Sequence, residues 1–280
     1  MTESPRPLAA SSALLEVDTV SHSYGGTEAG SRAPMTLDRI SLTAERGVFI
    51  SIIGPSGCGK STLLKLIAGL EIPTDGQSRV NGTPVRGVRR DVGFVFQNDA
   101  LLPWKTLRDN VALALRYRGV GKVDANDRAQ DWLARVGLGV LGDRYPNQVS
   151  GGQRKRASIC ATMVYEPELM LMDEPFGSLD VQTRDLIETD ILRVWGELAN
   201  QSVIFVTHDL EEAIAMSDRV IVLSSQPGTI KADYAVDLPR PRDVREVRSQ
   251  HRFGEIYESL WSDLRTEVMT ANARSTKPSG

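Results

Sequence analysis

Five short apolar runs divide the sequence, at residues 48–53, 93–96, 169–172, 203–206 and 220–223. Each has the length of a strand and is bounded by polar or small residues. Continuous apolar runs of this length are typical of strands buried on both faces, as in a parallel sheet. Longer segments with apolar residues at helical spacing lie between them. The pattern therefore predicts an α/β fold, a sheet with helices on its faces.

The segment from about residue 106 to residue 165 has a different pattern. Apolar residues recur at helical spacing over residues 107–115 and again over 132–136, with a polar stretch at 118–127. This spacing predicts a helical subdomain inserted between two strands, and not a second independent fold.

The rest of the chain is expected to form one domain over residues 14–270. Residues 1–13 and 271–280 are rich in small and polar residues and are predicted to be disordered tails. Residues 25–34 are predicted to be a glycine-containing surface loop. No repeat with a period of 20–50 residues is visible, which excludes a solenoid or a propeller.

Composition and charge exclude several classes of protein. The 280 residues include 33 Lys and Arg against 36 Asp and Glu, a net charge of -3, so no bulk positive field attracts nucleic acid. No apolar run approaches the ~20 residues of a membrane-spanning helix, and the first residues lack the pattern of a secretory signal. The two cysteines, Cys58 and Cys160, are too few for a disulfide framework. We therefore expect a cytoplasmic protein.

One motif identifies candidate chemistry. Residues 54–61 read Gly-Pro-Ser-Gly-Cys-Gly-Lys-Ser, which fits the phosphate-loop pattern G-x-x-x-x-G-K-[ST]. The motif directly follows the predicted strand at residues 48–53 and precedes a predicted helix at residues 62–70. This strand–loop–helix context is the one that the motif requires.

The residue types of this loop suit a nucleotide. Backbone N–H groups must converge on the phosphate oxygens, and Gly54, Gly57 and Gly59 leave room for that approach. The helix that follows directs its positive N-terminal end at the anion. We expect Lys60 to bridge the β- and γ-phosphates and Ser61 to bind Mg²⁺ through its hydroxyl.

A pair of carboxylates ends the predicted strand at residues 169–172. In α/β sheets, ligands bind at the carboxyl ends of the strands. We expect Asp173 to orient Mg²⁺ and Glu174 to polarise the water that attacks the γ-phosphorus. An acidic pair at a strand end is, by itself, more often a solvated turn, and the phosphate loop in the same chain favours the catalytic interpretation.

A second group of small residues, Ser150, Gly151, Gly152 and Gln153, precedes a predicted helix at residues 157–165. Free N–H groups at a helix start suit a further phosphate contact, but Ser150 is also a good N-capping residue. The local sequence alone favours capping.

Taken together, the motifs resemble a known family. The phosphate loop, Gln97, and the segments at 150–153, 173–174, 178–180 and 207–209 follow one another at characteristic intervals. In this order they resemble the nucleotide-binding subunit of an ABC transporter, over roughly residues 14–265. The resemblance implies a P-loop ATPase core with a helical subdomain and a small antiparallel β-subdomain near the N-terminus.

In that family, two subunits face each other head to tail and enclose two ATP molecules. By this resemblance, Tyr24 would stack on adenine, and Gln97 would sense Mg²⁺ and the lytic water. Glu174 would be the general base and His208 would hold the γ-phosphate. Asp180 would bridge the two subunits.

The resemblance also implies which other residues contact the nucleotide, with ATP and Mg²⁺ as cofactors. On the same subunit these are Gly54, Pro55, Ser56, Gly57, Cys58, Gly59, Lys60, Ser61 and Thr62. Residues reaching the γ-phosphate bound to the opposite subunit would be Ser150, Gly151, Gly152 and Gln153. The side chains near the metal would be Ser61, Gln97 and Asp173.

The segment after Gln97 resembles one subfamily of importers in particular. Leu101, Leu102 and Trp104 are apolar side chains on a predicted loop, and a Leu-Pro-Trp follows the same glutamine in importers of nitrate, sulfonates and taurine. In the family, this region grips a coupling helix of the membrane permease. The alternative is that these side chains pack under the helical insertion.

The C-terminal part resembles the same subfamily at residues 226–230 and 236–242. Pro227 and the glycine after it predict a tight turn between two short strands. A helix is predicted over residues 249–268. The five arginines of residues 240–252 are mixed with two acids, Asp243 and Glu246, and predict a solvated helix face, with weak contact to anionic lipid as the alternative.

These observations predict an ATP-hydrolysing subunit, peripheral to the cytoplasmic face of the inner membrane, that powers import of nitrate, sulfonate or taurine. Its expected partners are a second copy or a paralogous ATPase subunit, transmembrane permease subunits and, indirectly, an exported solute-binding protein. Three alternatives remain: an ABC subunit for another solute, a soluble ABC ATPase of translation or DNA repair, and an unrelated P-loop kinase or GTPase.

Overall fold

Each of the five apolar runs forms a strand of one six-stranded sheet in the computed structural model, which describes residues 13–25, 34–198 and 200–275. In spatial order the strands are β10 (Ile230–Ala235), β9 (Arg219–Leu223), β3 (Phe49–Ile53), β8 (Ser202–Val206), β7 (Leu169–Asp173) and β6 (Val92–Val95). Five of them run parallel, and β10 pairs antiparallel with β9 across the predicted turn at Pro227.

The parallel strands are mostly apolar because both faces of the sheet are covered, and the buried Ser51 of β3 is hydrogen-bonded to Ser217. In β8, Val203 and Phe205 pack into one core cluster, while Ile204 and Val206 pack into another. The same alternation holds along β7 and β9. Side chains of a strand alternate between faces, so a sheet between two cores has no polar face.

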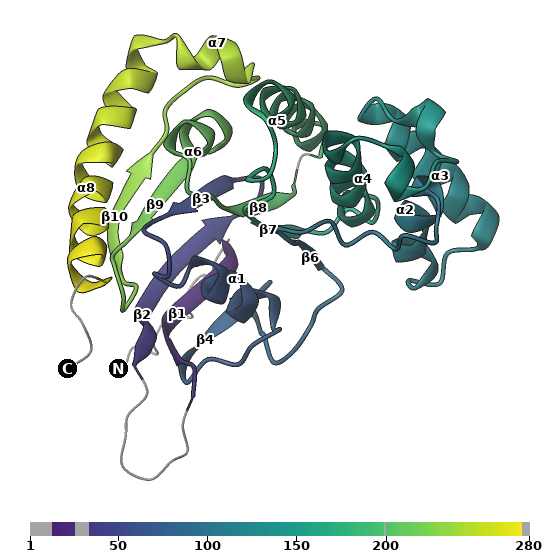
Figure 1. Cartoon of the computed structure of the whole chain (residues 1–280). Coiled ribbons are helices and arrows are strands. Elements are labelled where there is room, and N and C mark those ends of the chain that lie inside the picture. The colour runs from purple at the N-terminus through teal and green to yellow at the C-terminus, as the bar shows by residue number, and fades with distance from the viewer. Residues whose placement is uncertain (1–12, 26–33, 199, 276–280) are drawn as a thin grey trace, which may run out of the picture.

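The implied antiparallel β-subdomain is present near the N-terminus. It has the strand order β2-β1-β4-β5, with β1 (Ala13–Ser23), β2 (Met35–Glu45), β4 (Asp75–Val80) and β5 (Thr83–Pro84). Helix α1 (Lys60–Ala68) lies between this sheet and the parallel sheet, and its apolar side chains belong to the core that the two sheets share. Figure 1 shows α1 in this position, beside β1 and β4.

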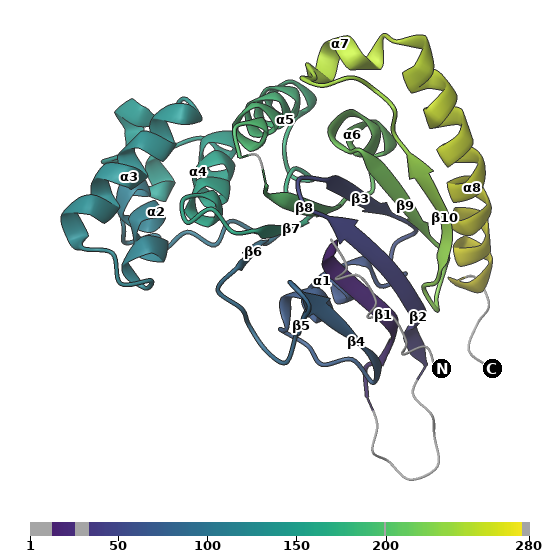
Figure 2. The same cartoon turned by 180° about the vertical axis from the view of Figure 1, so that it is seen from behind.

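The helical subdomain also forms as predicted. It contains α2 (Leu107–Arg116), α3 (Lys122–Arg135), the short helical turns η1 (Gly139–Leu141) and η2 (Pro146–Gln148), and α4 (Gly151–Met163). Figures 1 and 2 show α2 and α3 projecting to one side, away from the C-terminal helix, while α4 connects them to the sheet.

The remaining helices cover the second face of the sheet or its edge: α5 (Val181–Gly196), α6 (Leu210–Met216), α7 (Val244–Arg248) and α8 (His251–Ser275). Because α8 continues to Ser275, it extends into residues 271–280, which were expected to be a tail. The expected N-terminal tail and the loop at residues 25–34 lie almost entirely outside the described residues. None of the helices in the described parts of the chain has the length and apolarity needed to cross a membrane.

The prediction of a solvated arginine face holds for Arg245 and Arg252, whose side chains are 58% and 49% exposed, and is wrong for Arg242 and Arg248. The side chain of Arg242 is only 1% exposed, and its guanidinium donates to the backbone carbonyls of Ser217 (2.6 Å) and Leu238 (2.8 Å). Arg248 contacts Asp185 at 2.7 Å and Glu188 at 3.5 Å, both on α5. These arginines therefore attach the C-terminal segment to the domain.

Two glutamates beneath the C-terminal segment, Glu188 on α5 and Glu212 on α6, are buried. Glu188 is 0% exposed and Glu212, on α6, is 3% exposed. Burial, followed by the neighbouring Glu212 carboxyl, raises the pKa of Glu188 to about 9. Burial also raises the pKa of Glu212. Glu188 therefore keeps its proton in the folded protein at neutral pH.

We predict that Glu188→Gln increases stability relative to the wild type, and that this gain grows as pH rises from about 4.5 to about 9. In this window the unfolded wild type ionises Glu188 while the folded protein retains the proton, so the wild type loses stability and the glutamine variant does not. Urea unfolding at several pH values measures the difference, which should change by more than about 1 kcal/mol. Exposed Glu258→Gln is the control, and a gain for Glu188→Gln that is independent of pH would contradict the prediction.

Candidate nucleotide-binding site

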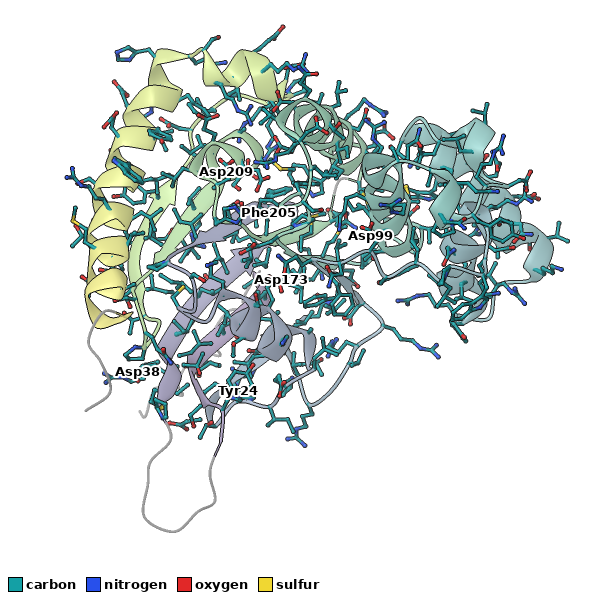
Figure 3. All side chains as sticks on the ribbon, viewed as in Figure 1. Tyr24, Asp38, Asp99, Asp173, Phe205 and Asp209 are labelled. Atoms are coloured by element: carbon teal, nitrogen blue, oxygen red, sulfur yellow. The ribbon has the colours of Figure 1, made fainter. Side chains whose placement is uncertain are left out.

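The motif residues emerge from adjacent strands at one edge of the parallel sheet. β8 lies between β3 and β7, and the three strands run in the same direction. The phosphate loop follows β3, Asp173 ends β7, and His208 comes shortly after β8. Carboxyl ends of parallel strands meet at the same edge, so segments far apart in sequence form one site. Figure 3 places Asp173 near the middle of the molecule.

The phosphate loop turns tightly into α1. Gly59 has φ 102° immediately before the helix, a backbone conformation that favours glycine. A Cβ at this position would lie only 2.6 Å from Cδ2 of Leu37 on β2. The Lys60 Nζ donates to the carbonyls of Gly54 (2.9 Å) and Pro55 (3.1 Å), so the lysine spans its own loop. Ser56 and Gly57 at the loop tip are exposed. Lys60 is thus buried against its own loop at the N-terminus of α1.

Ser61 and Asp173, both predicted to lie near the metal, are in direct contact. The Ser61 hydroxyl donates to the Asp173 carboxylate at 2.8 Å. Burial raises the pKa of Asp173, and the bond from Ser61 offsets part of this shift. A cation beside the pair would favour the ionised carboxylate.

The donor set fits magnesium. Among the described residues, no group of three or more His, Cys, Asp or Glu side chains could hold a metal ion. Mg²⁺ in nucleotide sites is bound by one or two protein oxygens, and phosphate and water supply the rest. The hydroxyl of Ser61 and the carboxylate of Asp173 are two such oxygens.

Glu174 and His208 form the second pair. The Nδ1 of His208 lies 3.2 Å from Oε2 of Glu174. Glu174 has φ 42°, rare for a residue with a side chain, and its N–H donates to the Val206 carbonyl at 2.9 Å. At this strand tip the strained backbone therefore lies against the end of β8.

Tyr24 and Cys58 differ in exposure: Tyr24 lies at the surface beside the phosphate loop, whereas Cys58 is buried within it. The Tyr24 hydroxyl donates to the Thr62 hydroxyl at 3.2 Å, and the ring is 48% exposed. An exposed aromatic ring beside the phosphate loop is available for stacking. Cys58 is 1% exposed, and burial raises the pKa of its thiol, so it packs beneath the loop.

The sequence did not indicate the role of Lys155. This side chain is 2% exposed, and its Nζ donates to the Gln97 carbonyl at 2.8 Å and pairs with Asp99 at 2.8 Å. Lys155 lies on α4, so the segment of Gln97 is attached to the helix that begins after Ser150. In the sequence Lys155 stands between Arg154 and Arg156 and resembles a further surface cation, so no local pattern indicates its burial or its partner.

Residues 150–153 form a separate cluster with the start of α5. The hydroxyl of Ser150 accepts from the Gln153 N–H, and the Gln153 side chain accepts from the Ser150 N–H, so the predicted capping is confirmed. At Gly152, a Cβ would lie 2.5 Å from the Thr183 side chain, which makes the close approach of α4 and α5 dependent on glycine. Asp180 caps α5 by accepting from the Thr183 N–H at 2.9 Å, and this bond lowers the pKa of Asp180. Contact between this cluster and a nucleotide on another subunit remains a prediction.

Comparison with known proteins agrees with this geometry. Residues 37–177 match the ABC transporter family. The taurine import ATP-binding protein TauB of Shigella sonnei is 42% identical over 253 residues, covering 89% of this chain and 96% of that protein. The nitrate import ATP-binding protein NrtD of Synechocystis sp. is 40% identical over 215 residues, covering 77% of this chain and 80% of that protein.

A solved structure is similar in fold as well as in sequence. The ATP-binding cassette MJ0796, in a dimeric post-hydrolysis state bound to ADP and Pi, superposes with a TM-score of 0.70. The match has 28% identity and covers 80% of this chain and 100% of that chain. With its phosphate loop, its Ser61–Asp173 pair and these relatives, the chain belongs to the ABC transporter family and is an ATP-hydrolysing cassette.

Proposed function

We propose that this chain is the ATPase subunit of a membrane importer for a small sulfonate, such as taurine, or for nitrate. The observation that carries the catalytic part is the meeting of the Ser61–Asp173 and Glu174–His208 pairs at one edge of the sheet. The names of relatives such as TauB and NrtD support the transport part. In this proposal, the protein works at the cytoplasmic face of the membrane and does not contact the solute.

The phosphate loop would bind the triphosphate through backbone N–H groups and the Lys60 ammonium. Ser61 and Asp173 would hold Mg²⁺, which supplies charge neutralisation at the β- and γ-phosphates when bound. Tyr24, exposed beside Thr62, would stack on the adenine. These contacts position the γ-phosphorus and require no covalent chemistry from the protein.

Hydrolysis requires an oriented water and a base. Glu174 would accept the proton of that water, since its carboxylate lies beside His208 and its side chain is 23% exposed. His208 would donate to the γ-phosphate and keep Glu174 in position. Gln97 would orient the water from the segment that Lys155 attaches to α4.

A second copy of the chain would complete the site. Ser150 and Gly151 stand at a helix N-terminus, where free N–H groups favour an anion, and Asp180 begins the neighbouring α5. The dimeric cassette with ADP and Pi supports this arrangement. Dividing the donors between two chains makes hydrolysis depend on closure of the dimer.

The loop around Trp104 would contact the permease. The side chain of Asn110 is buried and binds the backbone of this loop at four points, among them the Leu102 N–H (2.7 Å) and the Thr106 carbonyl (2.9 Å). Leu101 packs against the core, whereas Trp104 is 70% exposed. An exposed indole on a loop fixed in this way is typical of a binding surface.

The transport proposal is tested by affinity purification of the tagged chain from gently solubilised native membranes. Recovery of a multi-helix permease, and transport of taurine or nitrate by the reconstituted complex with its solute-binding protein, is the expected result. Recovery of ribosomes or DNA, or of no partner, would leave an ATPase without the transport role.

We predict that Glu174→Gln lowers kcat for ATP by at least about 100-fold while ATP binding is retained. The amide keeps the shape of the side chain but cannot accept the proton of the attacking water. Phosphate release measures turnover, and size-exclusion chromatography with ATP should show a persistent dimer. Exposed Glu258→Gln serves as the control, and full hydrolysis by Glu174→Gln would remove the base assignment.

We predict that Lys60→Ala weakens ATP binding by about tenfold or more, because a charge-assisted contact to phosphate is lost. Equilibrium titration with a fluorescent ATP analogue measures the affinity. Lys122→Ala, at the exposed start of α3, should bind as the wild type does. Equal affinities for both variants would contradict the proposed phosphate contact.

For the permease contact, we predict that Trp104→Ala reduces recovery of the membrane partner by about tenfold, the loss typical of a buried aromatic contact, while ATPase activity of the free chain is unchanged. Tyr117→Ala is the matched control, since Tyr117 is 80% exposed at the opposite end of α2. Equal recovery of the partner by the two variants would exclude Trp104 from the interface.

A further inference from the structure

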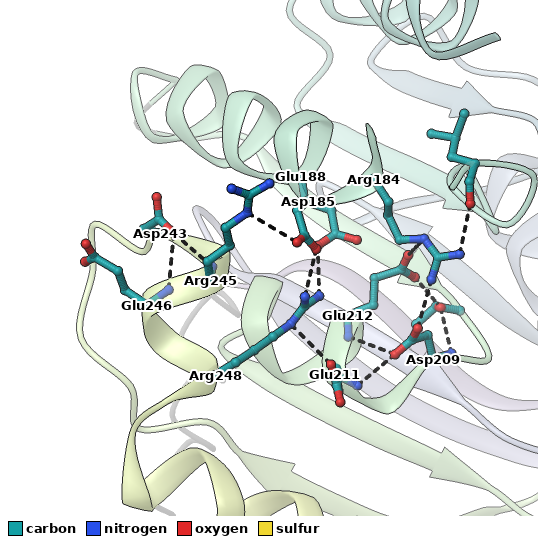
Figure 4. A network of polar contacts seen from close by, with 12 residues as sticks. Arg184, Asp185, Glu188, Asp209, Glu211, Glu212, Asp243, Arg245, Glu246 and Arg248 are labelled. Atoms are coloured by element: carbon teal, nitrogen blue, oxygen red, sulfur yellow. Dashed lines mark hydrogen bonds and ion pairs between the residues drawn. The ribbon is translucent and has the colours of Figure 1, made fainter. Parts of the chain in front are cut away.

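Arg184 on α5 connects two loops of the site through a side chain that is only 17% exposed. Its NH1 donates to Oδ2 of Asp209 at 2.9 Å, and its NH2 donates to the carbonyl of Leu179 at 3.3 Å. Its Nε lies 3.9 Å from Oε1 of Glu212. Figure 4 shows the guanidinium of Arg184 beside the carboxylates of Asp209 and Glu212.

The partners of Arg184 flank the residues assigned to the site. Leu179 directly precedes Asp180, and Asp209 directly follows His208. Arg184 is therefore a direct link between the segment of Asp180, proposed to reach the second subunit, and the segment of His208.

Asp209 itself has little freedom. Its Oδ1 accepts from the N–H groups of Glu211 (2.9 Å) and Glu212 (3.2 Å) at the start of α6. Its own N–H donates to the Thr207 hydroxyl at 3.0 Å. With one carboxylate oxygen held by the helix and the other by Arg184, the position of Asp209 determines where the preceding His208 lies.

We propose that Arg184 is a positioning residue for ATP hydrolysis, which holds the His208 segment in register with the Asp180 segment through Asp209. Arginine suits this role because its planar fork supplies several donors in fixed directions, whereas a lysine offers one compact charge. The inference rests on the proposed role of His208 in hydrolysis.

The buried acids next to Arg184 extend the link toward the C-terminal segment. The Thr207 hydroxyl donates to the Glu212 carboxylate, which lies beneath Arg184. On the same side of α5, Arg248 of α7 pairs with Asp185 and lies 3.4 Å from Glu211 on α6. Figure 4 shows this continuous set of contacts from α7 to the Asp209 loop. Loss of the Arg184 contact would therefore leave α6 attached from its other side.

Two substitutions weaken the Arg184–Asp209 contact while each keeps a polar side chain of similar size at its position. Arg184→Lys keeps the charge but not the fork. Asp209→Asn removes the charge yet retains a good N-cap for α6, so the helix start is preserved. The Arg184→Ala variant is less useful, since it leaves buried carboxylates unpaired and endangers the fold.

We expect each single variant to lower kcat by about tenfold, because a small displacement of a reacting group has effects of this size. The KM for ATP should remain within about twofold of wild type, since the phosphate loop is untouched. Turnover is measured on the full-length chain. The rate is divided by the concentration of ATP-binding sites found by titration, so that unfolded molecules do not lower the apparent kcat. Hydrogen exchange should become faster at the amides of Glu211 and Glu212 and stay unchanged in β3.

The double variant Arg184→Lys/Asp209→Asn distinguishes positioning from general damage. If Arg184 acts through Asp209, the double variant loses no more kcat than the worse single variant. Arg193→Lys is the matched control on the same helix, because the Arg193 side chain is 51% exposed and pairs with Asp190 and Glu197. It should retain full activity.

Each remaining outcome counts against the inference. Additive losses in the double variant, or a kcat of Arg184→Lys equal to that of Arg193→Lys, would overturn it. A separate His208→Ala variant keeps the two proposals distinguishable. Full hydrolysis by His208→Ala would refute the role of His208, whereas loss of hydrolysis there together with normal Arg184→Lys would refute only the positioning by Arg184.

Discussion

The order of the parallel strands is the constraint on which the site depends. β3, β8 and β7 are neighbours and run in one direction, so the segments that follow them leave the sheet side by side, at a spacing of about 5 Å between strands. The phosphate loop, His208 and the Asp173–Glu174 pair meet for this reason alone. A sheet with another strand order would hold the same motifs too far apart for the Ser61–Asp173 hydrogen bond.

Cations that are buried or half-buried attach several loops to other parts of the fold. Lys155 donates to the carbonyl of Gln97, Arg242 donates to carbonyls at the ends of α6 and β10, and Arg184 donates to the carbonyl of Leu179. A buried cation is costly unless it is fully paired, and backbone carbonyls are partners whose positions are fixed by the chain itself. Lys155 and Arg242 therefore each hold together segments that are far apart in the sequence, and Arg184 does so through its second contact, with Asp209.

This arrangement fits a protein whose chemistry is coupled to movement. Residues expected to bind nucleotide from the same chain lie on the sheet, while those expected to act on a second chain stand at the starts of α4 and α5. The Gln97 segment and the Trp104 loop are continuous in sequence and are held by Lys155 and Asn110. A shift of the helical subdomain would therefore move the proposed membrane contact and the proposed water-orienting residue together.

The sequence by itself determined the elements whose signal is local. The apolar runs form strands whose successive side chains are buried on opposite faces of the sheet. The phosphate loop lies between a strand and a helix, as its motif requires. Ser150 and Gln153 cap a helix within four residues of sequence. Only the tertiary structure decided that Lys155 and Arg242 are buried, that Leu101 turns inward while Trp104 does not, and that Arg184 reaches Asp209. The burial of an ionisable group depends on which distant segment supplies its partner, and no periodicity along the chain contains that information.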